Sequence, residues 1–360
     1  MDSFDQTLLD DPTRLAAIDT SQVLASIVAL PEQCLDAAAQ IQNLNFPDPY
    51  RSVKRVLIAG MGGSNLGGRI IEAVFADELT LPMVRLHDYH LPAWADAQTL
   101  IICSSYSGTT EETLSVAAEA IQRQLLWTAI GTGADLIALA QAQAVPYYQI
   151  QPTHNPSDQP RLALGYSLIG QLLILAKLGL INLPASAIDH LVAAMKLVVS
   201  QNQLSVPLNS NPAKQLAVSL YGRLPVLISS GHLIGTTHSL KNQFNENAKT
   251  FAACFDLPEL NHHLMEGLVH PSTNPQNLAF ISFLSSLYSE RISRRFSLTQ
   301  EVITQNHLPV YPYAVPGDTE LTQAFTGLQF GSFVIFYLGM LYQQDPAPIP
   351  WVDYFKAKLA

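Results

Sequence analysis

The sequence has little charge, and more acid than base. Only 13% of the 360 residues are charged, and 29 acidic residues outnumber 19 basic ones, which gives a net charge of −10 at pH 7. A dedicated surface for nucleic acid or for acidic lipids needs the opposite balance. We therefore expect neither nucleic acid nor a membrane among its partners, although a local cationic pocket for a small anion stays compatible with this composition.

Cysteine and long apolar runs are also scarce. The three cysteines, Cys34, Cys103 and Cys254, form no CxxC pair, so they provide no disulfide framework and fit a reducing compartment. The acidic start of the chain, MDSFDQTLLDD, is unlike a secretory signal or a basic transit peptide. The charge-free apolar stretch 330–342 has the length of a core helix and is too short for a membrane span. These features predict a cytoplasmic protein.

Apolar strands alternate with helical stretches through most of the chain. A helical segment comes first, with apolar residues at helical spacing over 10–45 and a break before Pro31. The predicted strands of the first half are 55–60, 83–89, 99–105, 125–131 and 145–150, and a long buried helix follows over 161–180. Strands that are apolar on both faces and separated by helices predict a parallel sheet covered on both sides.

A second cycle of the same kind begins near residue 185. Its predicted elements are a helix at 186–202, a strand at 223–231, a helix at 236–250, and strands at 278–284 and 301–305. VLIAGMGGSNLGGRIIEAV and VLISSGHLIGTTHSLKNQF share the order strand, Gly/Ser loop, helix, which indicates a duplicated unit. The predicted organisation is an N-terminal helical segment (1–45), two α/β subdomains (46–184 and 185–345) and a C-terminal segment (346–360).

The glycine-rich loop GMGGSNLGG lies between a predicted strand and a predicted helix. Its glycines let backbone N–H groups approach a ligand, and the helix N-terminus adds positive potential. No GK[ST] follows, so the loop is not a P-loop. A dinucleotide site and a tight turn without a ligand remain alternatives for this loop taken alone. The candidate binding residues here are Gly62, Gly63 and Ser64.

A second loop, SSYSGTTEET, opens a buried apolar strand into a cluster of hydroxyls. Ser105, Ser107, Thr109 and Thr110 stand just ahead of a helix predicted to begin near Glu111. Hydroxyls together with free helix-start amides form a neutral, donor-rich cradle for a phosphate monoester. Serine and threonine also cap helices, but one hydroxyl would suffice for that. Four of them beside a second glycine-rich loop favour phosphate binding.

These loops, with QPRLALGY and with NENAK and the downstream LPELNH, resemble the bifunctional phosphoglucose/phosphomannose isomerases, a branch of the sugar isomerase (SIS) superfamily. The resemblance extends from about residue 50 to the C-terminus and thins after Gly267. The SYSGxT[ET]E loop alone marks a phosphosugar-binding SIS domain, non-catalytic sensors included, whereas ENAK and ELNH are more specific. The resemblance implies an α/β fold of two SIS-type subdomains, each a parallel sheet flanked by helices in a flavodoxin-like three-layer sandwich. It also implies a homodimer without metal or other cofactor that acts on hexose 6-phosphates.

Two catalytic residues follow from the NENAK and ELNH motifs. Glu246 matches the family's base, which moves a proton between C1 and C2 of the sugar; the residues alone favour an exposed glutamate paired with Lys249 or Lys241. His262 matches the ring-opening histidine, which in the family enters from the neighbouring subunit. The ELNH register selects His262 over the adjacent His263.

Two cationic residues complete the set that the resemblance implies. Arg161 matches the arginine that stabilises the developing enediolate, and its fixed guanidinium stays charged. Lys356 resembles the lysine placed near the ring oxygen, with Lys358 as a competitor. Many family members have a threonine in a DPTP-like run before this segment; here Ala347 stands in its place, which weakens the local alignment.

The predicted function is therefore a metal-free aldose–ketose isomerase that interconverts glucose 6-phosphate, and also mannose 6-phosphate, with fructose 6-phosphate. A non-catalytic phosphosugar sensor is the main alternative, and it would need the phosphate cradle without the acid–base residues. An aminosugar isomerase is a third, for which no glutaminase segment is evident. A zinc site at His262, His263 and Glu266 lacks a further ligand at suitable spacing.

Overall fold

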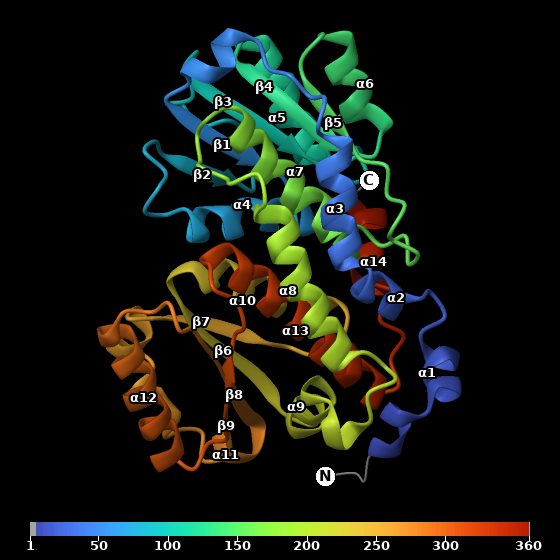
Figure 1. The fold of residues 1–360 in the computed structure, drawn as a ribbon, viewed down its shortest axis with the longest axis vertical. Coiled ribbons are helices and arrows are strands. Elements are labelled where there is room, and N and C mark those ends of the chain that lie inside the picture. Colours follow the sequence, from blue (N-terminus) through green and yellow to red (C-terminus); the bar gives the residue numbers. More distant parts are fainter. Residues whose placement is uncertain (1–4, 360) are drawn as a thin grey trace.

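The computed structural model describes residues 5–359, which form two α/β halves stacked one above the other (Figure 1). The first half holds a sheet of five parallel strands in the order β2-β1-β3-β4-β5. The strands are β1 (Arg55–Ala59), β2 (Met83–Leu86), β3 (Thr99–Ser104), β4 (Leu126–Gly131) and β5 (Tyr147–Gln149). This is the strand order of flavodoxin-like sheets, in which ligands bind beyond the carboxyl ends of the strands.

Helices cover both faces of the first sheet, as the apolar runs predict. Alternate residues of β1 belong to different cores: Val56 and Ile58 pack with one set of helices, and Leu57 and Ala59 with the other. The helices are α4 (Gly63–Val74) and α7 (Leu164–Lys177) on the first face, and α5 (Glu111–Gln122) and α6 (Ala134–Ala142) on the second. The predicted three-layer arrangement is confirmed.

The second half repeats the first with one strand fewer. Its parallel strands follow the order β7-β6-β8-β9, so that β6 lies between β7 and β8 as β1 lies between β2 and β3. They are β6 (Leu224–Ser230), β7 (Ala253–Leu257), β8 (Leu278–Leu284) and β9 (Val310–Ala314). One face packs on α10 (Ile234–Glu246) and α13 (Glu320–Leu341), and the other on α12 (Glu290–Gln305).

The strand predicted at 301–305 is wrong, because these residues form the last turn of α12. The run EVITQ carries β-branched residues that are typical of strands. In the structure, however, Phe296, Thr299 and Ile303 are buried at helical spacing, and packing on the sheet decides the conformation. The fourth strand, β9, lies a few residues further along.

The N-terminal helices bind the two halves together. They are α1 (Pro12–Ile18), α2 (Val23–Val28) and α3 (Leu30–Gln40), and α3 packs on α7 of the first half and on α8 (Ala187–Asn202), which leads into α9 (Pro212–Leu220) and the second half. Pro31 lies in the first turn of α3, as predicted. The divisions at residues 45, 184 and 345 remain predictions.

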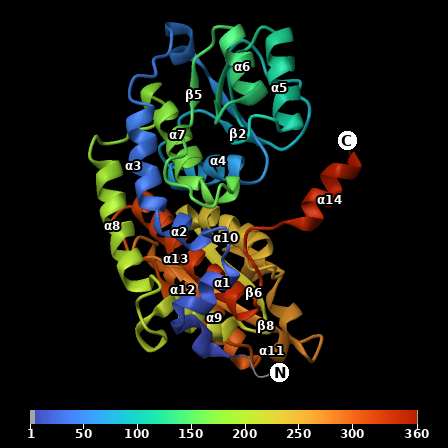
Figure 2. The same ribbon diagram turned by 90° about the vertical axis from the view of Figure 1, so that its right-hand side faces the viewer.

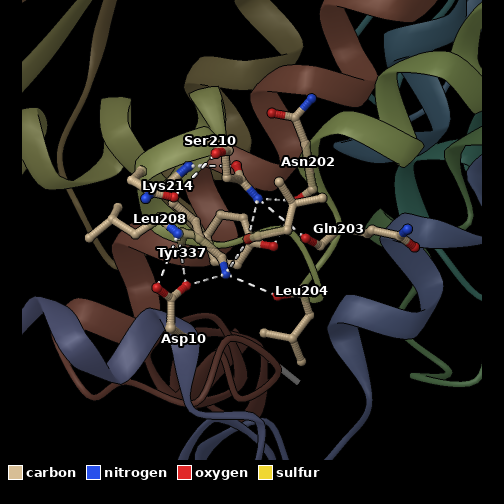
Figure 3. Close-up of polar contacts among 11 residues, drawn as sticks. Asp10, Asn202, Gln203, Leu204, Leu208, Ser210, Lys214 and Tyr337 are labelled. Carbon is tan, nitrogen blue, oxygen red and sulfur yellow. Dashed lines mark hydrogen bonds and ion pairs between the residues drawn. The ribbon is translucent and has the colours of Figure 1, made fainter.

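A buried lysine fixes the start of the chain to the second half (Figure 3). Lys214 of α9 is fully buried, and its ammonium group donates hydrogen bonds to Asp10 Oδ1 (2.8 Å) and to the carbonyls of Leu204 and Val206 (3.0 and 2.8 Å). It also lies 5.4 Å from the centre of the Tyr337 ring. Every donor of this ammonium therefore has a partner, as a buried charge requires.

The two halves meet where α4 crosses α10. A Cβ atom at Gly235 would lie only 2.6 Å from the carbonyl oxygen of Arg69, so the backbones touch and only glycine fits. Helix α13 is buried below this contact. It is the one helix among residues 5–359 that is long and apolar enough to cross a membrane, but the whole of its apolar window is buried in the protein. It is a core helix, as predicted for 330–342.

The last helix, α14 (Pro350–Leu359), projects from the body of the molecule (Figure 2). Every described residue of α14 is exposed, including Trp351 and Phe355, which are 82% and 62% exposed. The short helix α11 (Asn274–Asn277) completes the order of elements.

Candidate active site

The two predicted binding loops lie side by side at the carboxyl edge of the first sheet. β1 and β3 are neighbours, and the chain after each strand runs directly into a helix, α4 or α5. The N–H groups of both first turns therefore point to one place, where their partial positive charges favour an anion. Neither helix has a side-chain cap at its N-terminus.

The hydroxyls of the second loop pair with one another and do not cap α5. Ser105 Oγ lies 2.8 Å from Thr110 Oγ1, and Ser107 Oγ lies 3.0 Å from Thr109 Oγ1. Ser105 is buried, whereas Ser107 and Thr109 are exposed. Because Thr110, the N-cap residue of α5, makes no side-chain cap hydrogen bond, the capping alternative does not explain this cluster.

Hydrogen bonds to the first loop and to α7 fix the conformation of the second loop. The backbone N–H of Tyr106 donates to Ser64 Oγ (3.0 Å), which joins the two loops. Gln171, fully buried on α7, donates to the Ser64 carbonyl (2.7 Å) and to Ser104 Oγ (3.2 Å). Sequence reasoning missed this glutamine, although a lone amide inside an otherwise apolar helix was a signal for it.

Gly108 allows the tight turn of the loop. Its φ of +74° is in the left-handed region, and a Cβ atom there would lie 2.0 Å from the carbonyl oxygen of Gly133. Its own N–H donates to Ser105 Oγ (3.1 Å). Glycine is therefore required at this position for the hydroxyls to converge.

Arg161 lies against the first loop and reaches the second half of the molecule. A Cβ atom at Gly63 would be 3.4 Å from Arg161 Cα. The Arg161 side chain is 8% exposed, and its Nε donates to Asn247 Oδ1 (2.7 Å). Nη1 donates to Gln159 Oε1 (2.9 Å), and Nη2 donates to the carbonyls of Pro346 and Ala347 (2.8 and 2.5 Å).

These contacts make Arg161 a clamp on the C-terminal segment. Four of its five N–H donors are engaged by the described residues, which leaves one on Nη1. Arg161 binds the backbone carbonyl of Ala347, so this hydrogen bond does not depend on the side chain that stands in place of the threonine of the DPTP-like run.

Glu246 ends α10 directly beside Arg161. Its Oε2 lies 3.7 Å from Arg161 Nε, and its side chain is 35% exposed. Burial raises the pKa of this carboxyl, although the charges of Arg161 and Lys249 act against the increase. The carboxyl opens on a cavity of about 540 Å³ between the end of α10 and the C-terminal segment, which Lys249, Asp345 and Trp351 also line.

Lys249 is a second group at this site that sequence reasoning treated only as an ion-pair partner. Its Nζ donates to the carbonyls of Glu246 (2.5 Å) and Pro346 (3.1 Å). Burial and the neighbouring charge of Arg161 lower its pKa to about 8. A lysine with such a pKa can give up and regain a proton near neutral pH.

The structure does not bring His262 to this group within one chain. His262 ends the short turn that follows β7; it is exposed, and no hydrogen bond or ion pair among residues 5–359 joins it to Glu246 or Arg161. Lys356 stands on the exposed α14, and its charge is among those that lower the pKa of Glu246. Lys358 instead lies over the ring of Tyr354.

The described residues offer no obvious site for a metal ion. Among residues 5–359, no group of three or more histidine, cysteine, aspartate or glutamate side chains has an arrangement that could hold one. The groups available for chemistry are a carboxyl with a raised pKa, an amine with a lowered pKa and a buried guanidinium that lies against the first of the two predicted binding loops.

Solved structures confirm the fold. A hypothetical protein from Thermus thermophilus matches 98% of this chain and 93% of its own with a TM-score of 0.75 at 17% identity. Glucosamine-6-phosphate deaminase from Thermotoga maritima matches 96% of this chain and 98% of its own with a TM-score of 0.65 at 13% identity. At these identities the likeness concerns the fold alone.

Sequence comparison is more specific. The family model for the C-terminal SIS domain of bacterial phospho-glucose isomerase matches residues 209–359. The bifunctional phosphoglucose/phosphomannose isomerase of Caldicellulosiruptor bescii is 33% identical, over 93% of this chain and 98% of its own length. That of Thermoplasma acidophilum is 26% identical, over 92% of this chain and 100% of its own length. With two SIS-type halves, both loops and near-complete coverage of such a relative, the chain belongs to the bifunctional phosphoglucose/phosphomannose isomerase family.

Proposed function

We propose that the protein interconverts glucose 6-phosphate and fructose 6-phosphate, and mannose 6-phosphate and fructose 6-phosphate, through a shared enediol. The observation that carries this proposal is the Glu246 carboxyl, 3.7 Å from a buried arginine that packs against the phosphate-binding loop. The membership of an isomerase family agrees with it.

The 6-phosphate would lie in the cradle of Gly62, Gly63, Ser64 and the hydroxyl loop with Ser105, Ser107, Thr109 and Thr110. These groups are neutral donors, so the phosphate binds without fixing a counter-ion beside the reacting carbons. Because this contact is remote from C1 and C2, it holds the substrate equally through all steps.

Glu246 would then act as the base. In the open-chain aldose its carboxylate takes the proton from C2, the C2–H electron pair forms the C1=C2 bond, and the carbonyl electron pair moves to O1, which gains a proton. Glu246 returns its proton to C1 while the O2 hydroxyl loses one, which gives the ketose with no net change in atoms. A raised pKa suits a carboxyl that must both accept and return a proton. Arg161 supplies positive charge near the enediolate oxygens.

Both aldoses fit one base because they differ only at C2. That carbon becomes planar in the enediol, and rotation about C2–C3 presents either face to Glu246. The cavity of about 540 Å³ beside the carboxyl provides space for such a rotation. The sensor alternative does not account for a half-buried carboxyl of raised pKa beside Arg161, so it is not favoured.

The test uses purified protein with fructose 6-phosphate and no added metal or nucleotide. We expect both glucose 6-phosphate and mannose 6-phosphate to appear, and Glu246→Gln to lower kcat by about 10²–10⁴, the range for loss of a general base. Glu301→Gln, a neutralisation on the exposed face of α12, is the matched control and should leave the rates unchanged. Tight binding of fructose 6-phosphate without turnover would support the sensor instead.

We also propose that the enzyme works as a homodimer in which His262 enters the site of the partner subunit to open the sugar ring, with Lys356 near the ring oxygen. The exposure of His262 and of all of α14 in one chain supports this. Such an enzyme would serve glycolysis and gluconeogenesis in the cytoplasm.

Hybrid dimers test the shared site. Inactive Glu246→Gln and His262→Ala chains should regain activity when they are coexpressed, because one site of each mixed dimer then has both residues. With random pairing the mixture should reach about a quarter of the native rate. If both residues of a site come from one chain, the mixture stays inactive.

A further inference from the structure

A second, strongly basic cavity lies where the two halves of the molecule meet. It has a volume of about 340 Å³, and Arg69 of α4, His87 after β2, and His238 and Lys241 of α10 line it. Each half thus contributes cationic or imidazole side chains to one space. Nothing in the proposed isomerisation uses them.

No ion pair of the described residues neutralises the positive charge of this cavity, although the Glu72 carboxylate acts on Arg69 at longer range. Among the ion pairs of residues 5–359, none includes Arg69, Lys241 or either histidine. The nearby Arg85 adds to the positive potential, and its own partner is Glu72, at 2.6 Å. In a protein of net charge −10, with 29 acidic residues available, an unpaired cluster of this kind is unexpected unless an anion completes it.

Burial, and to a smaller extent the neighbouring positive charges, keeps the two imidazoles of the cavity neutral. Burial, followed by the charges of Arg69 and Lys241, lowers the pKa of His238 to about 4. Burial also lowers the pKa of His87, with Arg85 and Arg69 adding to the effect. At neutral pH both imidazoles are thus uncharged. His87 already has the Gly60 backbone as a hydrogen-bond partner, whereas His238 can donate one hydrogen bond, beside a fixed guanidinium and an ammonium.

We propose that this basic cavity is a binding site for a small phosphate-bearing anion, separate from the cradle that holds the substrate's 6-phosphate. A guanidinium binds two phosphate oxygens at once, an ammonium adds a point charge, and the neutral imidazole of His238 donates a further hydrogen bond. The cradle, by contrast, is built from hydroxyls and helix-start amides. Gly62 borders both sites. The proposal does not depend on the isomerase activity.

Inorganic phosphate is the probe, and titration calorimetry counts its sites. The native protein should bind phosphate in two classes of site per chain. Arg69→Gln should remove one class, and Ser105→Ala with Thr110→Ala should remove the other. Arg294→Gln, which removes a charge from the exposed side of α12, is the control and should keep both.

Cys254 offers a second readout that is local to the cavity. It is the only one of the three cysteines that is not buried, and the charges of Lys241 and Arg69 act on its thiol. An anion in the cavity offsets those charges, so less of the reactive thiolate is present. Phosphate should therefore slow alkylation of Cys254 by the neutral reagent iodoacetamide by about twofold or more, and have no effect in Arg69→Gln.

Lys241→Gln provides the same comparison if the Arg69 variant does not fold. A single class of phosphate site in the native protein, two classes remaining in both variants, or alkylation of Cys254 that is indifferent to phosphate would each overturn the proposal. Loss of all phosphate binding in Arg69→Gln would also overturn it, because the basic cavity would then be the substrate's own phosphate site.

Discussion

Removal of the charge of Arg161 should change how activity depends on pH. In the proposed mechanism the reacting form of Glu246 is the carboxylate, so the rate should rise with pH through the pKa of this group. Burial raises that pKa and Arg161 holds it down. In Arg161→Gln the restraint is gone, the pKa rises further, and the acidic limb of the kcat/KM profile moves to higher pH.

The size of the effect follows from the distance. Two unit charges 3.7 Å apart interact by about 1 kcal/mol in water and by about 4 kcal/mol at an effective dielectric of 20. The Glu246 side chain is 35% exposed, so solvent screens the pair and the lower figure applies. We expect an extra loss of roughly five- to tenfold in kcat/KM at acidic pH relative to pH 8, on top of any loss that is independent of pH.

Arg161→Lys separates the charge of this residue from its clamp. An ammonium keeps the positive charge but cannot hold Asn247 and the two carbonyls of residues 346 and 347 together. Hydrogen exchange of the Asp345 and Ala347 amides should increase in both variants, whereas the acidic limb should move only in Arg161→Gln. If the acidic limb keeps its native position in Arg161→Gln, the ionising base is not Glu246 or is not under the control of this arginine.

Three further predictions concern other parts of the structure. Lys214→Met should lower the free energy of unfolding by about 3 kcal/mol, because the lysine is fully buried and its loss leaves two carbonyls without a donor. Asp10→Asn should lower it by only about 1 kcal/mol, because the aspartate side chain is 42% exposed. Urea denaturation measures both values, and the reverse order would contradict the network. Gly108→Ala should raise KM for fructose 6-phosphate about tenfold, because the added carbon collides with a carbonyl that closes the turn, while Gly222→Ala, at the same φ of +74° with open space around it, should leave KM unchanged. Lys249, with its pKa lowered to about 8, should react with acetic anhydride at pH 7.5 ahead of lysines with an ordinary pKa. Peptide mass spectrometry will show whether fructose 6-phosphate protects it.

The architecture was readable from the sequence where strands are buried on both faces. β3 and β8 are continuous apolar runs, and their predicted and observed bounds nearly coincide. β7 and β9 were missed because both lie at sheet edges and are only partly buried, so their sequences lack that signal. The same weakness of local signals produced the wrong strand at 301–305.

The sequence predicted those parts of the site that lie within one continuous segment, and not the contacts between distant segments. The hydroxyl loop is one continuous segment, and its order in the sequence already places Ser105 near Thr110. The contact between Arg161 and Glu246 joins residues from different halves and exists only because α4 and α10 pack together. No spacing could have shown that Arg161 would hold the backbone at 346 and 347, nor that the pKa of Lys249 would be lowered beside it.

The glycine at the crossing of α4 and α10 has a consequence for how substrate enters. With Gly235 and Arg69 touching backbone to backbone, the two halves have no clearance for sliding, and a hinge between them would have to pull this contact apart. The halves therefore form a rigid frame, and the movable wall of the cavity beside Glu246 is the C-terminal segment, which hydrogen bonds from Arg161 and Lys249 fasten to the frame. Hexose phosphates of different shape are then accommodated by movement of the C-terminal segment and not by movement of the two halves.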